Sequence, residues 1–244
     1  MMGKLYLLPN LLGDTEVRQV LPEHVTGILK KLRVFATENV KNTRRFLKKI
    51  DKNICIDELT FLDLNEHSTR EEIESYLPYL TVQDVGIISE AGCPGIADPG
   101  AELVALAHQH QFQVVPLVGP SSILLALMAS GCNGQNFSFN GYLPVNRQDR
   151  AKALKIFEKQ SLQENRTQIF IETPYRNLTL LEDMLSVLSP TTKLTIACDL
   201  TTANEYVKTR SVKEWKNEKP GIHKRPTIFI VYAGMKECKK GCRS

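Results

Sequence analysis

The sequence has few of the residues that mark a disulfide-rich, metal-binding or membrane protein. Its 244 residues include six cysteines, of which only Cys238 and Cys242 lie close together. That pair has no second ligand pair, and the five histidines form no His-Glu-x-x-His, so no metal site is predicted. The longest apolar run, residues 123–129, is far shorter than the ~20 residues that span a bilayer. No signal peptide precedes the first strand-like run, so we expect a protein of the reducing cytoplasm.

Apolar, strand-like runs alternate with amphipathic stretches along the first half of the chain. Ser68, with Glu71 three residues on, predicts a capping box at the start of one helix. Alternation of this kind indicates an α/β fold whose sheet is mostly parallel, with helices on its faces. The predicted strands are 5–9, 34–38, 54–59, 85–89 and 114–118, and the predicted helices are 16–32, 40–50, 69–80 and 101–111.

The second half has fewer helices per strand. The runs 194–200 and 205–211 are joined too briefly for a crossover helix, which indicates antiparallel pairing and a mixed sheet. Pro-Leu-Val-Gly-Pro at 116–120 interrupts the pattern, so we predict a domain of residues 1–117, a second of 121–236 and a basic tail of 237–244. Further strands are predicted at 137–143, 168–173 and 227–233, and helices at 121–130, 148–160 and 178–188.

Three loops rich in glycine and proline follow predicted strands of the first half. They comprise residues 9–14, 89–100 and 118–123. In open α/β sheets, ligands bind beyond the carboxyl ends of the strands, and such loops expose backbone groups there. Any one of them alone is typical of an ordinary turn, and the dinucleotide and P-loop fingerprints are absent. Three in succession indicate a ligand site at one edge of the sheet.

The loop 89–100 reads Ser-Glu-Ala-Gly-Cys-Pro-Gly-Ile-Ala-Asp-Pro-Gly. It resembles the Ser-Asp-Ala-Gly-x-Pro-x-x-x-Asp-Pro-Gly signature of the tetrapyrrole methylase superfamily. The similarity is strongest to the branch that methylates a ribose 2′-hydroxyl of bacterial small-subunit ribosomal RNA. Shorter matches extend almost to Gly234 and include residues 5–9, 36–39, 114–120, 139–144, 169–176 and 199–201.

The resemblance implies a two-domain α/β fold, a homodimer, and S-adenosylmethionine bound in the cleft between the domains. It also implies which residues contact this cofactor. In the first domain they are Leu12, Gly92, Cys93 and Ile96, and in the second they are Ser122, Ile123, Thr173, Pro226 and Thr227.

The sequence departs from that branch at four places. Asn-Leu-Leu-Gly-Asp at 10–14 replaces Thr-Pro-Ile-Gly-Asn, and Glu90 replaces the aspartate of the signature. Residues 38–41 read Glu-Asn-Val-Lys for Glu-Asp-Thr-Arg, and residues 198–202 read Cys-Asp-Leu-Thr-Thr for Arg-Glu-Leu-Thr-Lys. These changes keep the outline of the cofactor loops and affect expected substrate-side positions, so the resemblance implies the cofactor more firmly than the substrate.

Methyl transfer from a sulfonium to a ribose hydroxyl requires in-line positioning and removal of the hydroxyl proton. Glu38 and Asp98 lie just past predicted strand ends and are the candidate general bases. Each has an ordinary alternative, since Glu38 could cap the helix at Val40 and Asp98 could begin a turn or cap the next helix. Ser121 and Ser122 lack a His-Asp partner pattern, and we expect them to cap a helix.

The net charge of +4 conceals an uneven distribution. Residues 1–119 have 12 basic and 16 acidic side chains, whereas residues 120–244 have 19 and 11. Basic residues also line one face of the helix predicted at 40–50, which is either an RNA-binding face or an ordinary solvated one. Arg147, Arg150 and Lys152 open a helix in the second half and extend the expected RNA footprint to both domains. The basic face comprises Lys41, Arg44, Arg45, Lys48, Lys49 and Lys52.

Three hypotheses of function follow. The first is an S-adenosylmethionine-dependent methyltransferase acting on a ribose hydroxyl of small-subunit ribosomal RNA. The second keeps the cofactor but methylates a carbon of a porphyrin-like macrocycle, and the basic second half argues mildly against it. The third is a non-catalytic RNA-binding or ligand-sensing homologue, which the departures near 10–14, 39–41 and 198–202 keep open.

Overall fold

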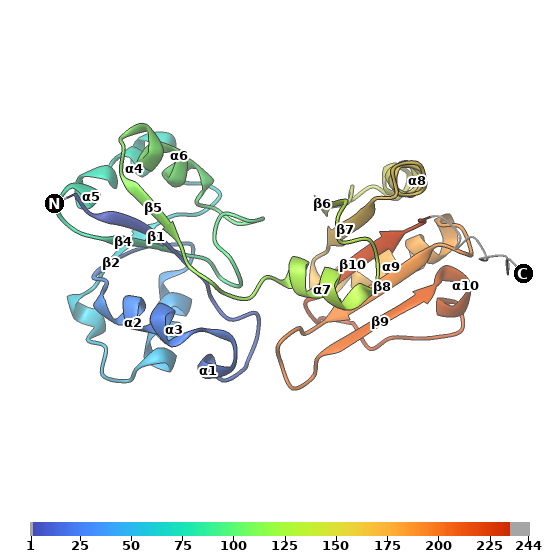
Figure 1. Ribbon diagram of the computed structural model, residues 1–244, viewed down its shortest axis with the longest axis horizontal. Coiled ribbons are helices and arrows are strands. Elements are labelled where there is room, and N and C mark those ends of the chain that lie inside the picture. Colours follow the sequence, from blue (N-terminus) through green and yellow to red (C-terminus); the bar gives the residue numbers. More distant parts are fainter. Residues whose placement is uncertain (1, 235–244) are drawn as a thin grey trace, which may run out of the picture. The chain divides into compact units, whose positions relative to one another are not determined.

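The computed structural model describes residues 2–234, and the chain divides into two units, Met1–Ser121 and Ser122–Ser244 (Figure 1). Each unit is built around its own five-stranded sheet. The predicted tail of 237–244, with Cys238 and Cys242, lies outside the described residues. Within residues 2–234, no helix combines the length and apolar character needed to cross a membrane.

The sheet of the first unit is parallel throughout and has the strand order β3-β2-β4-β1-β5. Its β2 and β4 are buried along their whole length, as expected for parallel strands covered on both faces. The strands are β1 (Lys4–Leu8), β2 (Val34–Thr37), β3 (Thr60–Asp63), β4 (Val85–Ile88) and β5 (Gln113–Pro116).

Helices cover both faces of this sheet (Figure 1). On one face, Leu29 and Leu47 of α2 and α3 pack against Phe35 of β2. On the other face, α4, α5 and α6 pack against the opposite side chains of the same strands. The helical segments are α1 (Val17–Val20), α2 (Glu23–Lys31), α3 (Val40–Ile50), the 3₁₀ turn η1 (Ile56–Glu58), α4 (Arg70–Glu74), α5 (Leu77–Val82) and α6 (Ala101–Gln109). The predicted α/β class with a parallel first sheet is confirmed.

Two helices predicted as continuous are each broken. The helix expected at 16–32 is α1 and α2, because the residue before Pro22 is extended and proline cannot donate in a helix interior. The helix expected at 69–80 is α4 and α5, with Pro78 in the first turn of α5. The capping box is real but one residue later than predicted, between Thr69 and Glu72.

The strand predicted at 54–59 is wrong. Residues 56–58 form η1, in which Leu59 N donates to Ile56 O at 3.1 Å. The strand of this region, β3, begins at Thr60, whose N donates to Arg33 O at 2.8 Å beside β2. The apolar residues before it indicated a strand, but pairing with β2 places the start of the strand six residues further on and its end four residues further on.

The sheet of the second unit is mixed, as predicted, with the order β6-β7-β10-β8-β9. The β6–β7 pair is parallel, and the other pairs are antiparallel, including the predicted β8–β9 pair. The strands are β6 (Phe137–Tyr142), β7 (Thr167–Ile171), β8 (Lys193–Cys198), β9 (Tyr206–Ser211) and β10 (Thr227–Tyr232). The helical segments are α7 (Ser122–Ser130), α8 (Arg147–Glu164), η2 (Pro174–Arg176), α9 (Asn177–Val187) and α10 (Val212–Trp215).

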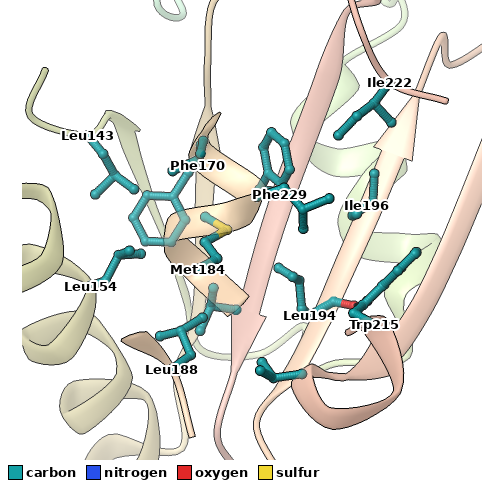
Figure 2. Close-up of a cluster of buried hydrophobic side chains, with 14 of the residues drawn as sticks. Leu143, Leu154, Phe170, Met184, Leu188, Leu194, Ile196, Trp215, Ile222 and Phe229 are labelled. Atoms are coloured by element: carbon teal, nitrogen blue, oxygen red, sulfur yellow. Dashed lines mark hydrogen bonds between the residues drawn. The ribbon is translucent and has the colours of Figure 1, made fainter. Parts of the chain in front are cut away.

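The core of the second unit lies between this sheet and helices α8, α9 and α10 (Figure 2). Phe170 and Phe229 of the sheet are fully buried against Met184 of α9. Trp215 is also fully buried, and its indole Nε1 donates to Leu194 O at 2.7 Å, which satisfies its one polar group. Helix α7 contacts β8, β9 and β10 of the same sheet.

Candidate functional site

The loops that follow β1 and β4 are hydrogen-bonded to each other at the carboxyl edge of the first sheet. Asn10 N donates to Gly92 O at 2.8 Å, and Gly92 N donates to Asn10 O at 3.2 Å. The buried side chain of Asn10 donates from Nδ2 to the carbonyl oxygens of Ser89 at 2.9 Å and Glu90 at 3.1 Å. Its Oδ1 accepts from Leu11 N at 2.7 Å. One asparagine therefore joins the first loop to the signature loop 89–100.

The loop that follows β5 meets the same two loops. Gly119 lies so close to Pro9 that a β-carbon on the glycine would overlap the proline ring. Cys93 Sγ donates to the carbonyl oxygen of Pro120 at 3.5 Å. The three loops that the sequence singled out are thus in mutual contact at one edge of the sheet.

Gly92 occupies a position that disfavours any side chain. Its φ is +71°, in the left-handed region. A β-carbon there would lie 3.1 Å from Leu12 Cδ2 and 3.4 Å from the carbonyl oxygen of Pro120. The backbone at Gly92 is therefore held between the other two loops, and Leu12 and Gly92, both predicted cofactor contacts, are neighbours.

An open, largely apolar cavity of about 430 Å³ is lined by the signature loop 89–100, by residues of β1, β4, β5 and α6, and by Leu117. Cys93 and Ile96, two further predicted contacts, line it together with Val104 and Leu117, whereas Leu12 and Gly92 are outside the lining. Gly95 also lines it with a φ of +76°, and a β-carbon there would have no protein atom within 4 Å. The volume is within the range of about 300–1,000 Å³ that small-molecule sites occupy.

Carboxylates gather where β2 and β4 end. Burial raises the pKa of Glu38, and the negative charges of Asp98, Glu90 and Glu66 raise it further. Burial also raises the pKa of Asp98; it outweighs the hydrogen bond from Ser89, which lowers the pKa, and the negative charge of Glu90 adds a smaller increase. Both candidate bases therefore share one electrostatic environment, which holds a proton more tightly than water does.

The capping roles considered for these carboxylates are wrong. Helix α3 is capped by Asn39, whose Oδ1 accepts from Asn42 N at 3.2 Å, so Glu38 is not its cap. The residue before α6 is Gly100, at a φ of +128°, and it leaves Asp98 two residues outside the helix. The positions of Glu38 and Asp98 thus have no explanation in helix capping.

The basic face of α3 is exposed, while Phe46 and Leu47 on the same helix are buried in the core. Lys41 and Arg45 make no ion pair with any residue between 2 and 234, and Arg44 stacks over the Phe61 ring with its guanidinium carbon 5.2 Å from the centroid. The exposed basic residues of the helix are Lys41, Arg44, Arg45, Lys48 and Lys49.

The two ends of α3 differ in their surroundings. At its start, the Asn42 side-chain amide donates to the Glu90 carboxylate, so the helix begins beside the signature loop. At its end, Lys49 Nζ pairs with Asp14 at 2.7 Å, and Lys48 Nζ donates to Lys52 O at 2.9 Å. Lys52 was predicted on the same helical face, but α3 ends at Ile50, so this part of the prediction is wrong.

In the second unit, the predicted contacts Thr173, Pro226 and Thr227 lie at one end of the sheet. Ile171 pairs with Ile228, so the segments that carry these residues leave the sheet side by side. Thr173 is exposed, whereas Thr227 is buried and its hydroxyl donates to Arg225 O at 2.9 Å. Ser122 and Ile123 are half-buried in the first turn of α7.

Arg150 is not available to RNA. Its guanidinium is 2.6 Å from Asp183, and it also donates to the carbonyl oxygens of Pro144 (3.0 Å) and Val145 (2.8 Å). Arg147 pairs with the other oxygen of Asp183 at 2.8 Å. The expectation that Arg150 contributes to an RNA footprint is wrong, because this arginine is buried and fixes the loop before α8.

Within residues 2–234, the structure brings no three histidine, cysteine, aspartate or glutamate side chains together as metal ligands. Sequence reasoning found the three loops, but it missed the roles of Asn10 and Asn42. Only the departure of 10–14 from the family pattern drew attention to the first of these.

Comparison with known proteins places these features in context. The sequence model of the tetrapyrrole (corrin/porphyrin) methylases matches residues 20–215. The ribosomal RNA small subunit methyltransferase I of Escherichia coli O157:H7 is 30% identical over 233 residues, which are 94% of this chain and 77% of that protein. The protein of the same name from Synechocystis sp. (strain ATCC 27184 / PCC 6803 / Kazusa) is 33% identical over 205 residues, or 84% and 69%.

Solved structures show the same fold. The methyltransferase CobJ has a TM-score of 0.61 at 16% identity, covering 94% of both chains. The uroporphyrin III C-methyl transferase of Thermus thermophilus has a TM-score of 0.57 at 17% identity, covering 94% of this chain and 97% of that one. At these identities the likeness supports the fold.

Proposed function

The chain belongs to the tetrapyrrole (corrin/porphyrin) methylase family and is a methyltransferase, and we propose that it transfers a methyl group from S-adenosylmethionine to a ribose 2′-hydroxyl of small-subunit ribosomal RNA. The observation that carries the proposal is the junction of three loops beside an apolar cavity, with two carboxylates of raised pKa and a basic helix beginning at the same edge. Relatives named for ribosomal RNA methylation, at about one third identity over most of the chain, support the substrate.

The first unit fits S-adenosylmethionine. The cofactor combines a flat adenine with a sulfonium, and the apolar cavity, open at Gly95, matches the adenine and the carbon chains around the sulfur. When bound, the cofactor supplies an electrophilic methyl group. We assign Leu12, Gly92, Cys93 and Ile96 of the first unit, and Ser122, Ile123, Thr173, Pro226 and Thr227 of the second, to holding it.

The chain's own contribution to the reaction is to position the ribose and to remove its proton. We propose that Glu38 accepts the hydroxyl proton, with Asp98 as its neighbour. A raised pKa makes a carboxylate a better base than it is in water, and it approaches the working pH at which general bases are most effective. The exposed cations of α3, which begin beside these carboxylates, would hold the phosphates that flank the target nucleotide.

We further propose a cytoplasmic homodimer. Ribosomal subunits are present in the cytoplasm, and the family resemblance implies the dimer. On α7, Met128 is 79% exposed, an apolar surface that a second copy would cover. Light scattering of the purified chain measures this directly: we expect twice the mass of 27.5 kDa, and a monomer at micromolar concentration would contradict it.

Two measurements test the proposed function. Titration calorimetry with S-adenosylmethionine should give one site per chain, and absence of heat at millimolar ligand would contradict the cofactor. Labelled cofactor is then incubated with small ribosomal subunits, with free small-subunit ribosomal RNA and with a reduced uroporphyrin. We expect label in the RNA-containing acceptors; transfer to the macrocycle instead would show a C-methyltransferase, and cofactor binding without transfer to any acceptor would favour a non-catalytic homologue.

A further inference from the structure

A second concave surface lies on the second unit, away from the predicted cofactor positions. We call it the α8 groove; it is an open hollow of about 750 Å³ lined by α8, by the turn before β8 and by the end of β10. Figure 1 shows the end of β10 reaching the flank of α8. Its lining includes Lys155, Glu158 and Lys159 of α8, Thr191 and Lys193 of the turn and the strand after it, and Tyr232 of β10.

Positive charge dominates the groove. Lys155 and Lys159 are four residues apart on α8, so they lie on the same helix face, and Lys193 opens β8. All three are exposed, and the side-chain ammonium of none of them has an ion pair or hydrogen bond with any residue from 2 to 234. Unpaired cations gathered in a hollow attract an anion.

The walls of the groove are fixed by internal hydrogen bonds. Glu158, the one carboxylate among the described lining residues, accepts from Ser189 N at 2.7 Å and from the Thr192 hydroxyl, which joins the turn to α8. Tyr232 donates from its hydroxyl to Asn165 Oδ1 at 2.5 Å, which holds its ring in the wall. Because Glu158 is committed to the turn, the three lysines remain for a ligand.

The position of the groove indicates the size of that ligand. Thr227 begins β10, at the end of the sheet where the cofactor contacts are proposed, and Tyr232 ends it in the groove. Five residue steps of about 3.3 Å separate the two ends by about 17 Å. A small acceptor at the reacting end does not reach so far, whereas a polymer with regularly spaced phosphates does.

We propose that the α8 groove binds the phosphodiester backbone of the RNA substrate, as a contact remote from the methylated nucleotide. The inference rests on the proposed function, since it takes RNA as the substrate. The lysines hold phosphate oxygens, the exposed Thr191 side chain adds a hydroxyl, and the Tyr232 ring offers a face to a sugar or base.

The test compares two triple charge reversals in the same unit. The groove variant is Lys155→Glu/Lys159→Glu/Lys193→Glu. The matched control is Lys213→Glu/Lys216→Glu/Lys219→Glu, which makes the same charge change at exposed lysines outside the groove. Binding of labelled small-subunit ribosomal RNA is measured between 50 and 200 mM salt. Each phosphate contact contributes about 0.7 to the salt slope on single strands and about 0.9 on duplex, so three lost contacts lower the slope by about 2 to 3.

Raising the salt from 50 to 200 mM should therefore weaken RNA binding by the groove variant about 20- to 40-fold less than it weakens binding by wild type. The KM of the groove variant for RNA should rise, while its binding of S-adenosylmethionine is unchanged. Equal curves for the groove variant and the control, with RNA methylation by wild type intact, would overturn the groove and leave the proposed function standing. A wild type that neither binds nor methylates RNA would overturn both. Loss of binding to phosphatidylserine vesicles but not to RNA would assign the groove to a lipid surface. If the reversals unfold the unit, the same lysines changed to glutamine give the same comparison.

Discussion

Replacing Asn10 by alanine should weaken cofactor binding without unfolding the protein. The change removes three side-chain hydrogen bonds, to the carbonyl oxygens of Ser89 and Glu90 and from Leu11 N. Ser89 is 5% exposed, so its carbonyl loses its partner where water does not easily replace it, whereas Glu90 is exposed. A buried carbonyl left without a partner costs about 1–3 kcal/mol, and a hydrated one costs less.

The free energy that favours the joined arrangement of the two loops should therefore fall by about 2 kcal/mol. The backbone bridge between Asn10 and Gly92 remains, so the first sheet stays folded and the loss is confined to the edge that carries the cofactor contacts. If S-adenosylmethionine binds only the joined loops, 2 kcal/mol weakens its Kd by about 30-fold. Titration calorimetry measures this, and circular dichroism checks that the fold survives.

The matched control for Asn10 is Asn136→Ala in the second unit. Asn136 Nδ2 also donates to a backbone carbonyl, that of Glu164 at 2.8 Å, but far along the chain from the signature loop. We expect the control to bind the cofactor as wild type does. If Asn10→Ala and Asn136→Ala have the same Kd as wild type, the bridge between the first two loops does not organise the cofactor site, and the reasoning is refuted.

Three further predictions concern the site. Gly92→Leu should abolish S-adenosylmethionine binding with the fold intact, because a side chain at φ +71° would press on Leu12 and Pro120; an unchanged Kd would contradict the loop assignment. Glu38→Gln should remove the fall in kcat on the acidic side of the pH profile. In wild type we expect this fall above pH 4.5, the ordinary carboxylate pKa, because the folded protein favours the protonated form of Glu38. For the same reason the charged carboxylate destabilises the fold above that pH, so Glu38→Gln should melt no lower than wild type at pH 7, and a clear drop in Tm would indicate a structural role. Reversing Arg44, Arg45, Lys48 and Lys49 to glutamate should weaken RNA binding and lower its salt slope, and superimposable salt titrations would leave α3 as a solvated face.

Local patterns were enough to predict most of the fold. Helix α3 and strand β10 lie within one residue of their predicted bounds, because each combines a clear period with clear ends. The errors occur where a local signal competes with pairing. Proline divides α1 from α2. The strand expected at 54–59 is replaced by β3, because only residues from Thr60 onward pair with β2.

The site was predicted less completely than the fold. Loop composition and the family signature identified 9–14, 89–100 and 118–123, but the bonds that join the first two of these loops link residues about 80 positions apart. No local pattern reveals that Asn10 reaches Ser89. Charge pattern was also insufficient for Arg150, which reads as a surface cation but is buried against Asp183. Burial and the choice of a hydrogen-bond or ion-pair partner are tertiary properties. They can be predicted from the sequence only where a resemblance to a known family indicates them.

The position of the transferred methyl group tests the central proposal most directly. Purified enzyme is incubated with small ribosomal subunits and S-adenosylmethionine labelled in its methyl group, and the RNA is then digested to nucleosides and analysed by mass spectrometry. We predict label in a single 2′-O-methylated nucleoside, with alkali-resistant linkage at that position, and labelling about 10²- to 10⁴-fold slower when Glu38→Gln is used. Label on a base, or RNA that stays unlabelled while the enzyme binds its cofactor, would contradict ribose methylation by this chain.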